Sequence, residues 1–120
     1  MIEIKNKVSI WFGKFDTKGK FVKYIKKTYN EDGDSIPSQF MKDFKIKSFD
    51  EDFLEVFFDT AIDNSSFEDI SYSETFLEKI KINFSVYNCT ILLYDFSYTG
   101  TIKEKDNVKF YGTLDYQKTN

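Results

Sequence analysis

The side chains that most often carry out chemistry are scarce in this sequence. Among its 120 residues there is no His and no Arg, all 17 basic residues are Lys, and Cys89 is the single cysteine. Without His there is no imidazole to act as a base or as a metal ligand. Without Arg there is no bidentate clamp for phosphate groups. Cys89 lies beside an apolar run and has no His to activate it, so we interpret it as a buried, unreactive thiol. The sequence therefore predicts no catalytic residue.

Carboxylates are the abundant reactive groups, and they gather in the middle of the chain. Asp50, Glu51, Asp52, Glu55 and Asp59 could supply the oxygen ligands that Ca²⁺ or Mg²⁺ prefers, or a pair of them could run acid–base chemistry. However, the EF-hand spacing with its glycine is absent, and no spacing selects a catalytic pair. A run of charged side chains is most often a solvated surface. We therefore predict no metal site and no cofactor, and a small carboxylate-dependent metal-binding enzyme stays as the alternative.

The net charge of −3 is spread unevenly along the chain. Residues 1–28 carry 8 Lys and 2 acids, whereas residues 29–78 carry 14 acids and 3 Lys, a local charge of −11. An extended acidic surface attracts basic proteins and speeds their association, although composition alone fits ordinary solubility equally well. We expect six exposed acids to form a partner-binding patch: Asp32, Asp34, Asp50, Glu51, Asp52 and Glu55.

The lysine-rich first segment raises the question of nucleic-acid binding. Its aromatic residues Phe21 and Tyr24 sit at the spacing of a buried helix face, which leaves only Lys on the open face. The net acidity of the chain also opposes the binding of a polyanion. We therefore predict no nucleic-acid partner, and a regulatory module that binds an unknown partner stays as a further alternative.

A small set of strands and helices must position these acids. Residues 8–12 are rich in β-formers and end at Gly13, which predicts a strand with a terminating turn. Thr17 is then expected as the N-cap of a helix whose apolar residues continue at helical spacing to Tyr29. After an acidic loop, Pro37 is expected in the first turn of a short second helix.

Residues 48–60 allow two interpretations. Ser48 and Glu51 match a capping box that would open a helix. Residues 52–59, however, are rich in the aromatic and β-branched side chains that are typical of a strand. We favour the strand, because four large apolar residues crowd poorly on a narrow helical stripe.

The last third of the chain predicts one helix and two strands. Ser71 and Glu74 match another capping box, which predicts a helix that buries Phe76. Residues 89–96 are an apolar run typical of a strand that is buried on both faces. Residues 108–114 are expected to be its antiparallel neighbour, with a hairpin loop between the two.

The predicted order is β-α-α-β-α-β-β, in one α+β domain over residues 1–120 with helices packed on a mainly antiparallel sheet. A single Cys forms no internal disulfide, the N-terminus lacks a signal-peptide pattern, and the longest apolar run, residues 91–94, is too short to cross a bilayer. We therefore expect a cytosolic protein with no membrane partner. Seven residues are expected to share one core: Trp11, Phe12, Phe15, Phe76, Ile91, Leu93 and Phe110.

Six segments of the chain, taken in order, carry a resemblance to a known family. They are VSIWFGKF at 8–15, YNEDGD at 29–34, SQFMKDF at 38–44, FDEDFLE at 49–55, SYSE-x-F at 71–76 and LLYDF at 92–96. Together they resemble the immunity protein 22 family of bacterial polymorphic toxin systems. The resemblance spans about residues 8–98, and it implies a cytoplasmic antidote that is encoded beside a toxin and that binds and neutralises it without enzymatic activity. A cationic toxin domain such as a nuclease would suit the acidic middle of the chain.

Overall fold

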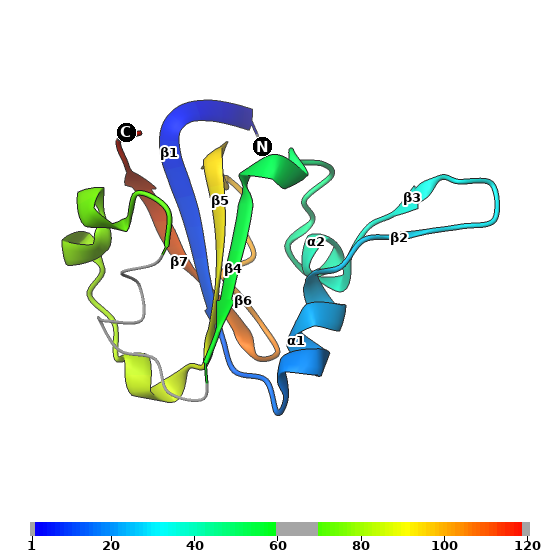
Figure 1. Cartoon of the computed structure of the whole chain (residues 1–120), viewed down its shortest axis with the longest axis horizontal. Coiled ribbons are helices and arrows are strands. Elements are labelled where there is room, and N and C mark those ends of the chain that lie inside the picture. Colours follow the sequence, from blue (N-terminus) through cyan, green and yellow to red (C-terminus); the bar gives the residue numbers. More distant parts are fainter. Residues whose placement is uncertain (1, 60–69, 119–120) are drawn as a thin grey trace.

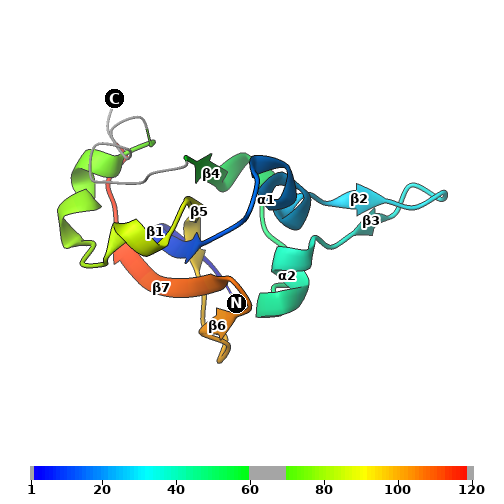
Figure 2. The ribbon, with the colours of Figure 1, turned by 90° about the horizontal axis from the view of Figure 1, so that it is seen from below.

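The computed structural model describes residues 2–59 and 70–118, and its main feature is a five-stranded sheet (Figure 1). The strands lie in the order β4-β5-β1-β7-β6, and every pairing is antiparallel. Helices and short turns cover the two faces, which Figure 2 shows on opposite sides of the sheet. The predicted class, α+β with a mainly antiparallel sheet, is confirmed. The strands are β1 (Ile2–Gly13), β4 (Leu54–Phe58), β5 (Cys89–Ser97), β6 (Glu104–Lys105) and β7 (Val108–Asp115).

The sheet separates two hydrophobic cores, so the prediction of one shared core is wrong. Successive side chains of a strand point to opposite faces. Trp11 therefore packs with Ile91 on the face that carries the helices, whereas its neighbour Phe12 packs with Phe76 on the other face. Of the other predicted core residues, Leu93, Phe15 and Phe110 join the cluster of Trp11.

β1 lies between β5 and β7, and the expectation that these two strands are neighbours is wrong. Trp11 of β1 is opposite Ile91 of β5 on one side and Phe110 of β7 on the other. The chain leaves β5, crosses to the far side of β1 and returns through β6, where Glu104 pairs with Lys109 of β7. The β1 sequence is apolar on both faces, which suits a central strand. The short separation of β5 and β7 along the chain fits both a hairpin and this crossing, so it does not decide between them.

Helix α1 (Lys18–Ile25) begins where the sequence predicts it. The Thr17 hydroxyl accepts the Lys20 N–H at 3.1 Å, which confirms the N-cap. The helix ends at Ile25, and Tyr29 instead lies in the short strand β2 (Thr28–Tyr29), which pairs with β3 (Ser35–Ile36). The expected extension of the helix to Tyr29 is therefore wrong.

Helix α2 (Gln39–Phe44) begins two residues after Pro37, so the expectation that Pro37 lies in its first turn is wrong. Ser38 is the N-cap, and its hydroxyl accepts the Met41 N–H at 3.2 Å. Pro37 therefore precedes the cap, because the Ser38 side chain supplies the acceptor that the first turn needs. Ser38 and the helix residues Phe40, Met41 and Phe44 are buried against the cluster of Trp11.

Residues 54–58 form strand β4, which confirms the strand interpretation of the ambiguous segment. A single 3₁₀ turn over Glu51–Phe53 precedes it. Asp50, and not Ser48, caps this turn, since its carboxylate accepts the Asp52 N–H at 3.0 Å. The helix expected to begin at Ser48 does not form.

Short 3₁₀ turns replace the third predicted helix. They cover Ser73–Thr75, Leu77–Lys79 and Phe84–Val86. The Ser71 N–H and hydroxyl both bind the Glu55 carboxylate, so Ser71 does not cap a helix. The order of helices and strands in the described residues is therefore β-α-β-β-α-β-β-β-β.

Candidate partner-binding surface

Two of the six predicted acids lie at the tip of a projecting hairpin. Asp32 and Asp34 follow Asn30, whose side-chain carbonyl accepts both of their N–H groups, at 2.9 and 3.0 Å. Gly33 between them has φ of +82°, which a tight turn of this kind requires. The two carboxylates are exposed, and Figure 1 shows the β2–β3 hairpin extending away from the body of the protein. We call Asp32 and Asp34 the hairpin acids.

Three more acids lie on the 3₁₀ turn in front of β4. Asp50, Glu51 and Asp52 are all exposed, and we call them the turn acids. Lys27 approaches Glu51 at 3.5 Å, the one basic side chain that forms an ion pair with this group among the described residues. A half-exposed pair of this kind is weak, so the turn keeps a strongly negative surface.

Glu55 has a different role from the other five. Its carboxylate accepts the Ser71 N–H at 3.2 Å, and its side chain is half-buried. It therefore holds the segment after residue 70 against β4. The six predicted residues do not form one group. The hairpin carries its two acids away from the 3₁₀ turn (Figure 1), whereas Glu55 lines a pocket together with Asp52. The expectation that the fold brings all of them together is wrong.

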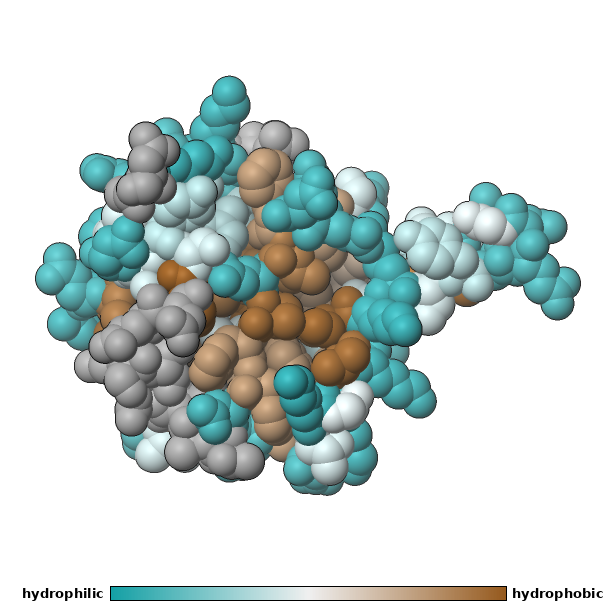
Figure 3. Space-filling model, in the orientation of Figure 1, coloured by the Kyte–Doolittle hydropathy of each residue, from teal (hydrophilic) through white to brown (hydrophobic). Residues whose placement is uncertain are grey.

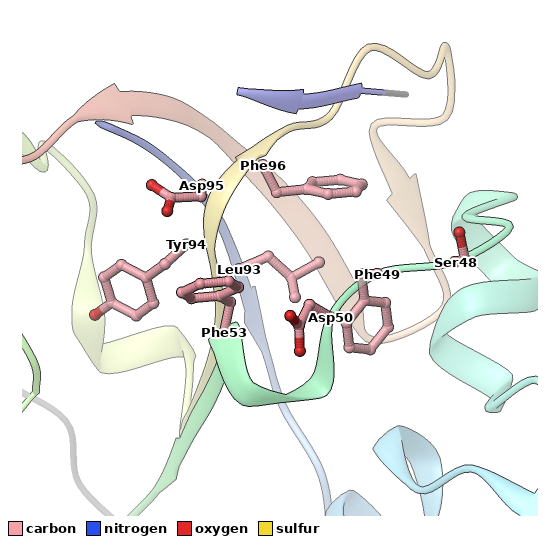
Figure 4. A pocket seen from close by; sticks show the side chains of 8 residues that line it. All are labelled: Ser48, Phe49, Asp50, Phe53, Leu93, Tyr94, Asp95 and Phe96. Carbon is pink, nitrogen blue, oxygen red and sulfur yellow. The ribbon is translucent and has the colours of Figure 1, made fainter. Parts of the chain in front are cut away.

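A pocket of about 210 Å³ opens beside the turn acids. β4 begins opposite Leu93, while β5 continues to Ser97, so the pocket occupies the space beyond the start of β4. Figure 4 shows the Asp50 carboxylate between the rings of Phe49 and Phe53, on the pocket side of the sheet. An exposed carboxylate in such a pocket suits the cationic end of a Lys or Arg side chain.

Asp95 lies at the same end of β5, but its side chain points to the opposite side from Asp50 (Figure 4). It is 4 % exposed, and it accepts hydrogen bonds from the Tyr116 hydroxyl at 2.6 Å, from Lys118 Nζ at 2.7 Å and from the Asn6 N–H at 2.9 Å. Burial alone would raise the pKa of this carboxyl, but the hydrogen bonds from Lys118, Tyr116 and Asn6 outweigh burial and hold the pKa below its usual value. Asp95 therefore ties the last described residues to the centre of the sheet.

We expect Asp95→Asn to flatten the dependence of stability on pH. Because the folded-state pKa lies below the unfolded one, the stabilisation is complete above the ordinary carboxyl pKa of about 3.9 and is lost as the pH falls through the folded value. Urea unfolding between pH 7 and pH 2 measures the effect. The variant should be less stable at pH 7 and should lose less stability on acidification than the wild type.

Asp106→Asn is the matched control for this experiment. Asp106 shares the left-handed backbone of Asp95, with φ of +51° against +55°, but its side chain is exposed. The same measurements on this variant show how much of any change comes from removing one negative charge at such a position. Equal pH dependence in wild type and Asp95→Asn would contradict the role given to Asp95.

Metal ligands and thiol groups are the next features to consider among the described residues. Within residues 2–59 and 70–118, no group of three Cys, Asp or Glu side chains is placed to hold a metal ion. Cys89 is buried, as predicted, and burial raises the pKa of its thiol to about 12, so it is protonated at neutral pH. No helix in this part of the chain is long and apolar enough to cross a membrane.

Sequence reasoning missed the exposed apolar residues. Tyr29 was expected on a buried helix face, but it is 64 % exposed on the hairpin. Val56 is 37 % exposed on β4, the last strand of the sheet. The sequence around Glu55 and Val56 does not indicate that Val56 is exposed. Its exposure depends on β4 being an edge strand, which is set by the order of the strands in the sheet. In the part of the chain that the structure describes, the other large apolar side chains that are exposed are Val22, Ile36 and Val86.

Comparison with known proteins identifies the family. The family model described as immunity protein 22 matches residues 8–117. This match covers nearly the whole chain and includes β6 and β7, which lie beyond the segments that carry the resemblance in the sequence. Comparison with curated proteins gave no match, and comparison with solved structures gave none. The chain therefore belongs to the immunity protein 22 family.

Proposed function

We propose that this protein is an immunity protein that acts in the cytoplasm, where it binds a cognate toxin and neutralises it. The observation that carries the proposal is the family match over residues 8–117. The described residues agree with a role in binding, because exposed charged and apolar side chains surround the antiparallel sheet. Binding residues are commonly found on loops and turns held by such a scaffold.

The acidic surface suggests the kind of toxin. Residues 29–78 carry a charge of −11, and the hairpin acids and turn acids are exposed. A toxin that acts on nucleic acid must present a cationic surface to its substrate. Carboxylates held on a projecting hairpin and on a turn could occupy such a surface and keep the substrate out. The proposed partner is therefore a cationic toxin domain, such as a nuclease.

The alternative of a carboxylate-dependent enzyme requires two or more acids that converge in one pocket. In the pocket beside the turn acids, Asp50 points into the hollow while Asp95 points to the other side (Figure 4). One exposed carboxylate in this pocket does not make an acid–base pair or a metal site. Asp52 and Glu55 line a second pocket, where the Glu55 carboxylate is engaged by the Ser71 N–H. The pocket beside the turn acids therefore fits a side chain of a protein partner better than a reaction centre.

Co-expression with the toxin domain encoded beside this chain's gene tests the function. Production of the toxin domain alone should stop bacterial growth, and co-production of this protein should restore it. The two proteins should also elute together from a sizing column. A second, unrelated toxin domain serves as the control, and its toxicity should persist. Growth arrest that continues with the cognate pair, together with separate elution, would refute the proposal.

A further inference from the structure

We propose that the outer edge of β4 is the docking site, where an extended basic segment of the toxin pairs as a sixth strand of the sheet. At the start of β4, a Lys or Arg of the same segment reaches Asp50 in the adjoining pocket. This inference rests on the proposed function, and it names the surface and the kind of contact through which the toxin is held.

The backbone geometry of β4 leaves a hydrogen-bonding edge open. Among the described residues, β4 pairs only with β5. The Asp59 N–H donates to the Asn88 carbonyl at 2.9 Å, in the register of the β4–β5 ladder. Because peptide groups alternate in direction along an antiparallel strand, Phe57 and Glu55 also face β5. The N–H and C=O of Val56 therefore point outward, away from the sheet.

The side chains around this edge provide an apolar strip. Val56 of β4 is 37 % exposed and Val22 of α1 is 43 % exposed. Figure 3 shows the same face as Figure 1, with apolar atoms gathered in its middle over β4 and α1. Solvent-exposed edges in soluble proteins are protected by several features, among them charged side chains, Pro, a bulge or a very short strand. β4 has one charged residue, Glu55, and is five residues long. β4 contains no Lys and no Pro, and its register with β5 runs without a shift.

Charge selects the occupant of the edge. Residues 50–59 contain five acids and no Lys. Two copies of this protein joined edge to edge through β4 would set these acids against each other, which is unfavourable. A polyanion is repelled for the same reason. A basic extended segment is attracted by the same charges, and its apolar side chains can cover Val56. This chemistry matches the cationic toxin of the proposed function.

The pocket beside the turn acids extends this contact beyond the end of β4. It lies along the part of β5 that β4 does not cover, so a strand that follows the β4 edge reaches it without leaving the sheet. Asp50 uses one carboxylate oxygen to cap the 3₁₀ turn, and the other oxygen is available to a cationic side chain. Phe49 and Phe53 line the walls. Lys27 and Lys118 of this protein already lie 5.2 Å and 5.7 Å from the centres of these two rings, so the contact rests on the Asp50 carboxylate.

Val56→Pro tests the backbone pairing in the complex with the toxin domain. Proline removes the outward N–H, but a proline at such a position of an edge strand is tolerated because that N–H lies outside the β4–β5 ladder. We expect the Kd for the toxin domain to rise roughly 10- to 100-fold. Val56→Ile, which keeps the N–H and the β-branched shape, should bind like the wild type. Circular dichroism checks that both variants are folded.

Amide exchange in the unchanged protein gives a second measurement. The Val56 amide should exchange rapidly in the free protein and become protected in the complex. The Phe57 amide, which faces β5, should be protected in both states. This comparison does not depend on how well the proline variant folds.

The outcomes separate this inference from the proposed function. Failure of the wild type to bind the toxin domain would refute both. Wild-type binding together with unaltered affinity of Val56→Pro and an unprotected Val56 amide would overturn the docking edge and leave the function standing. A wild-type dimer that Val56→Pro converts to a monomer would assign the edge to self-association and would also overturn the inference.

Discussion

Trp11→Ala should lower the free energy of unfolding by about 3–5 kcal/mol. Trp11 has no exposed surface and lies on the central strand β1. Its ring meets Phe40 of α2 edge-on at a centroid distance of 4.9 Å, and it contacts Tyr98 at 5.4 Å and Phe110 of β7 at 5.1 Å. Truncation to Ala therefore leaves a cavity that is lined by α2, β7 and the residue after β5. No single one of these elements can move to fill the cavity.

Trp11→Phe should cost clearly less and serves as the matched control. In the described part of the chain, Trp11 Nε1 has no hydrogen-bond partner, so the loss of the indole N–H removes no hydrogen bond. Urea unfolding followed by far-UV circular dichroism is the suitable measurement, because Trp11 is the single tryptophan and both variants lose its fluorescence. A loss below about 1 kcal/mol for Trp11→Ala, within the range of ordinary substitutions, would show that this side chain is not central to the core.

Local signals in the sequence predicted where several elements begin. Thr17 caps α1 as expected, because a side-chain oxygen before a helical pattern satisfies the first N–H groups wherever the helix packs. The same signal failed at Ser71, whose polar groups bind the carboxylate of Glu55, 16 residues earlier. A capping pattern shows which hydrogen bonds a serine can make with its neighbours in the sequence. An acceptor that is distant in the sequence can bind the same N–H and hydroxyl groups instead.

Strand pairing could not be predicted in the same way. β1 and β5 are both apolar on their two faces, and both are internal strands. The sequence shows that such strands are buried, but it does not show that β1 separates β5 from β7. The same topology places Trp11 and Phe12 in different cores and makes β4 an edge. The open edge of β4 follows from the order of the whole sheet, so no local pattern could indicate it.

Of the candidate site, the exposure of five of the six acids could be predicted, whereas the half-buried position of Glu55 and the arrangement of the group could not. Charged residues in turn-rich segments are solvated, as the hairpin acids and turn acids are. Their separation depends on the β2–β3 hairpin, which the helical spacing up to Tyr29 concealed. Tyr29 is therefore the clearest case in which an apolar residue was assigned to a helix face and instead lies exposed beside the acidic loop.

Charge reversal of two turn acids, Glu51→Lys with Asp52→Lys, should slow association with a cationic toxin domain roughly 100-fold at low salt. Neither side chain caps the 3₁₀ turn, a role that Asp50 fills, so the fold should be little affected. Because these acids flank the β4 edge, the dissociation rate should rise as well. The association rate of the wild type should itself fall with added salt, which screens the attraction.

Two further double variants locate the interface. Asp32→Lys with Asp34→Lys makes the same change of charge on the hairpin, and it should slow association with a smaller effect on dissociation, as charges at a rim do. Glu78→Lys with Glu104→Lys is the control, since both acids are exposed and lie on elements other than the hairpin and β4. Stopped-flow kinetics over a range of salt concentrations compares all three. If the control variant slows association as much as the turn variant, net charge alone steers the toxin and the turn acids are not its contact. If the turn variant associates and dissociates like the wild type, the toxin binds a different face.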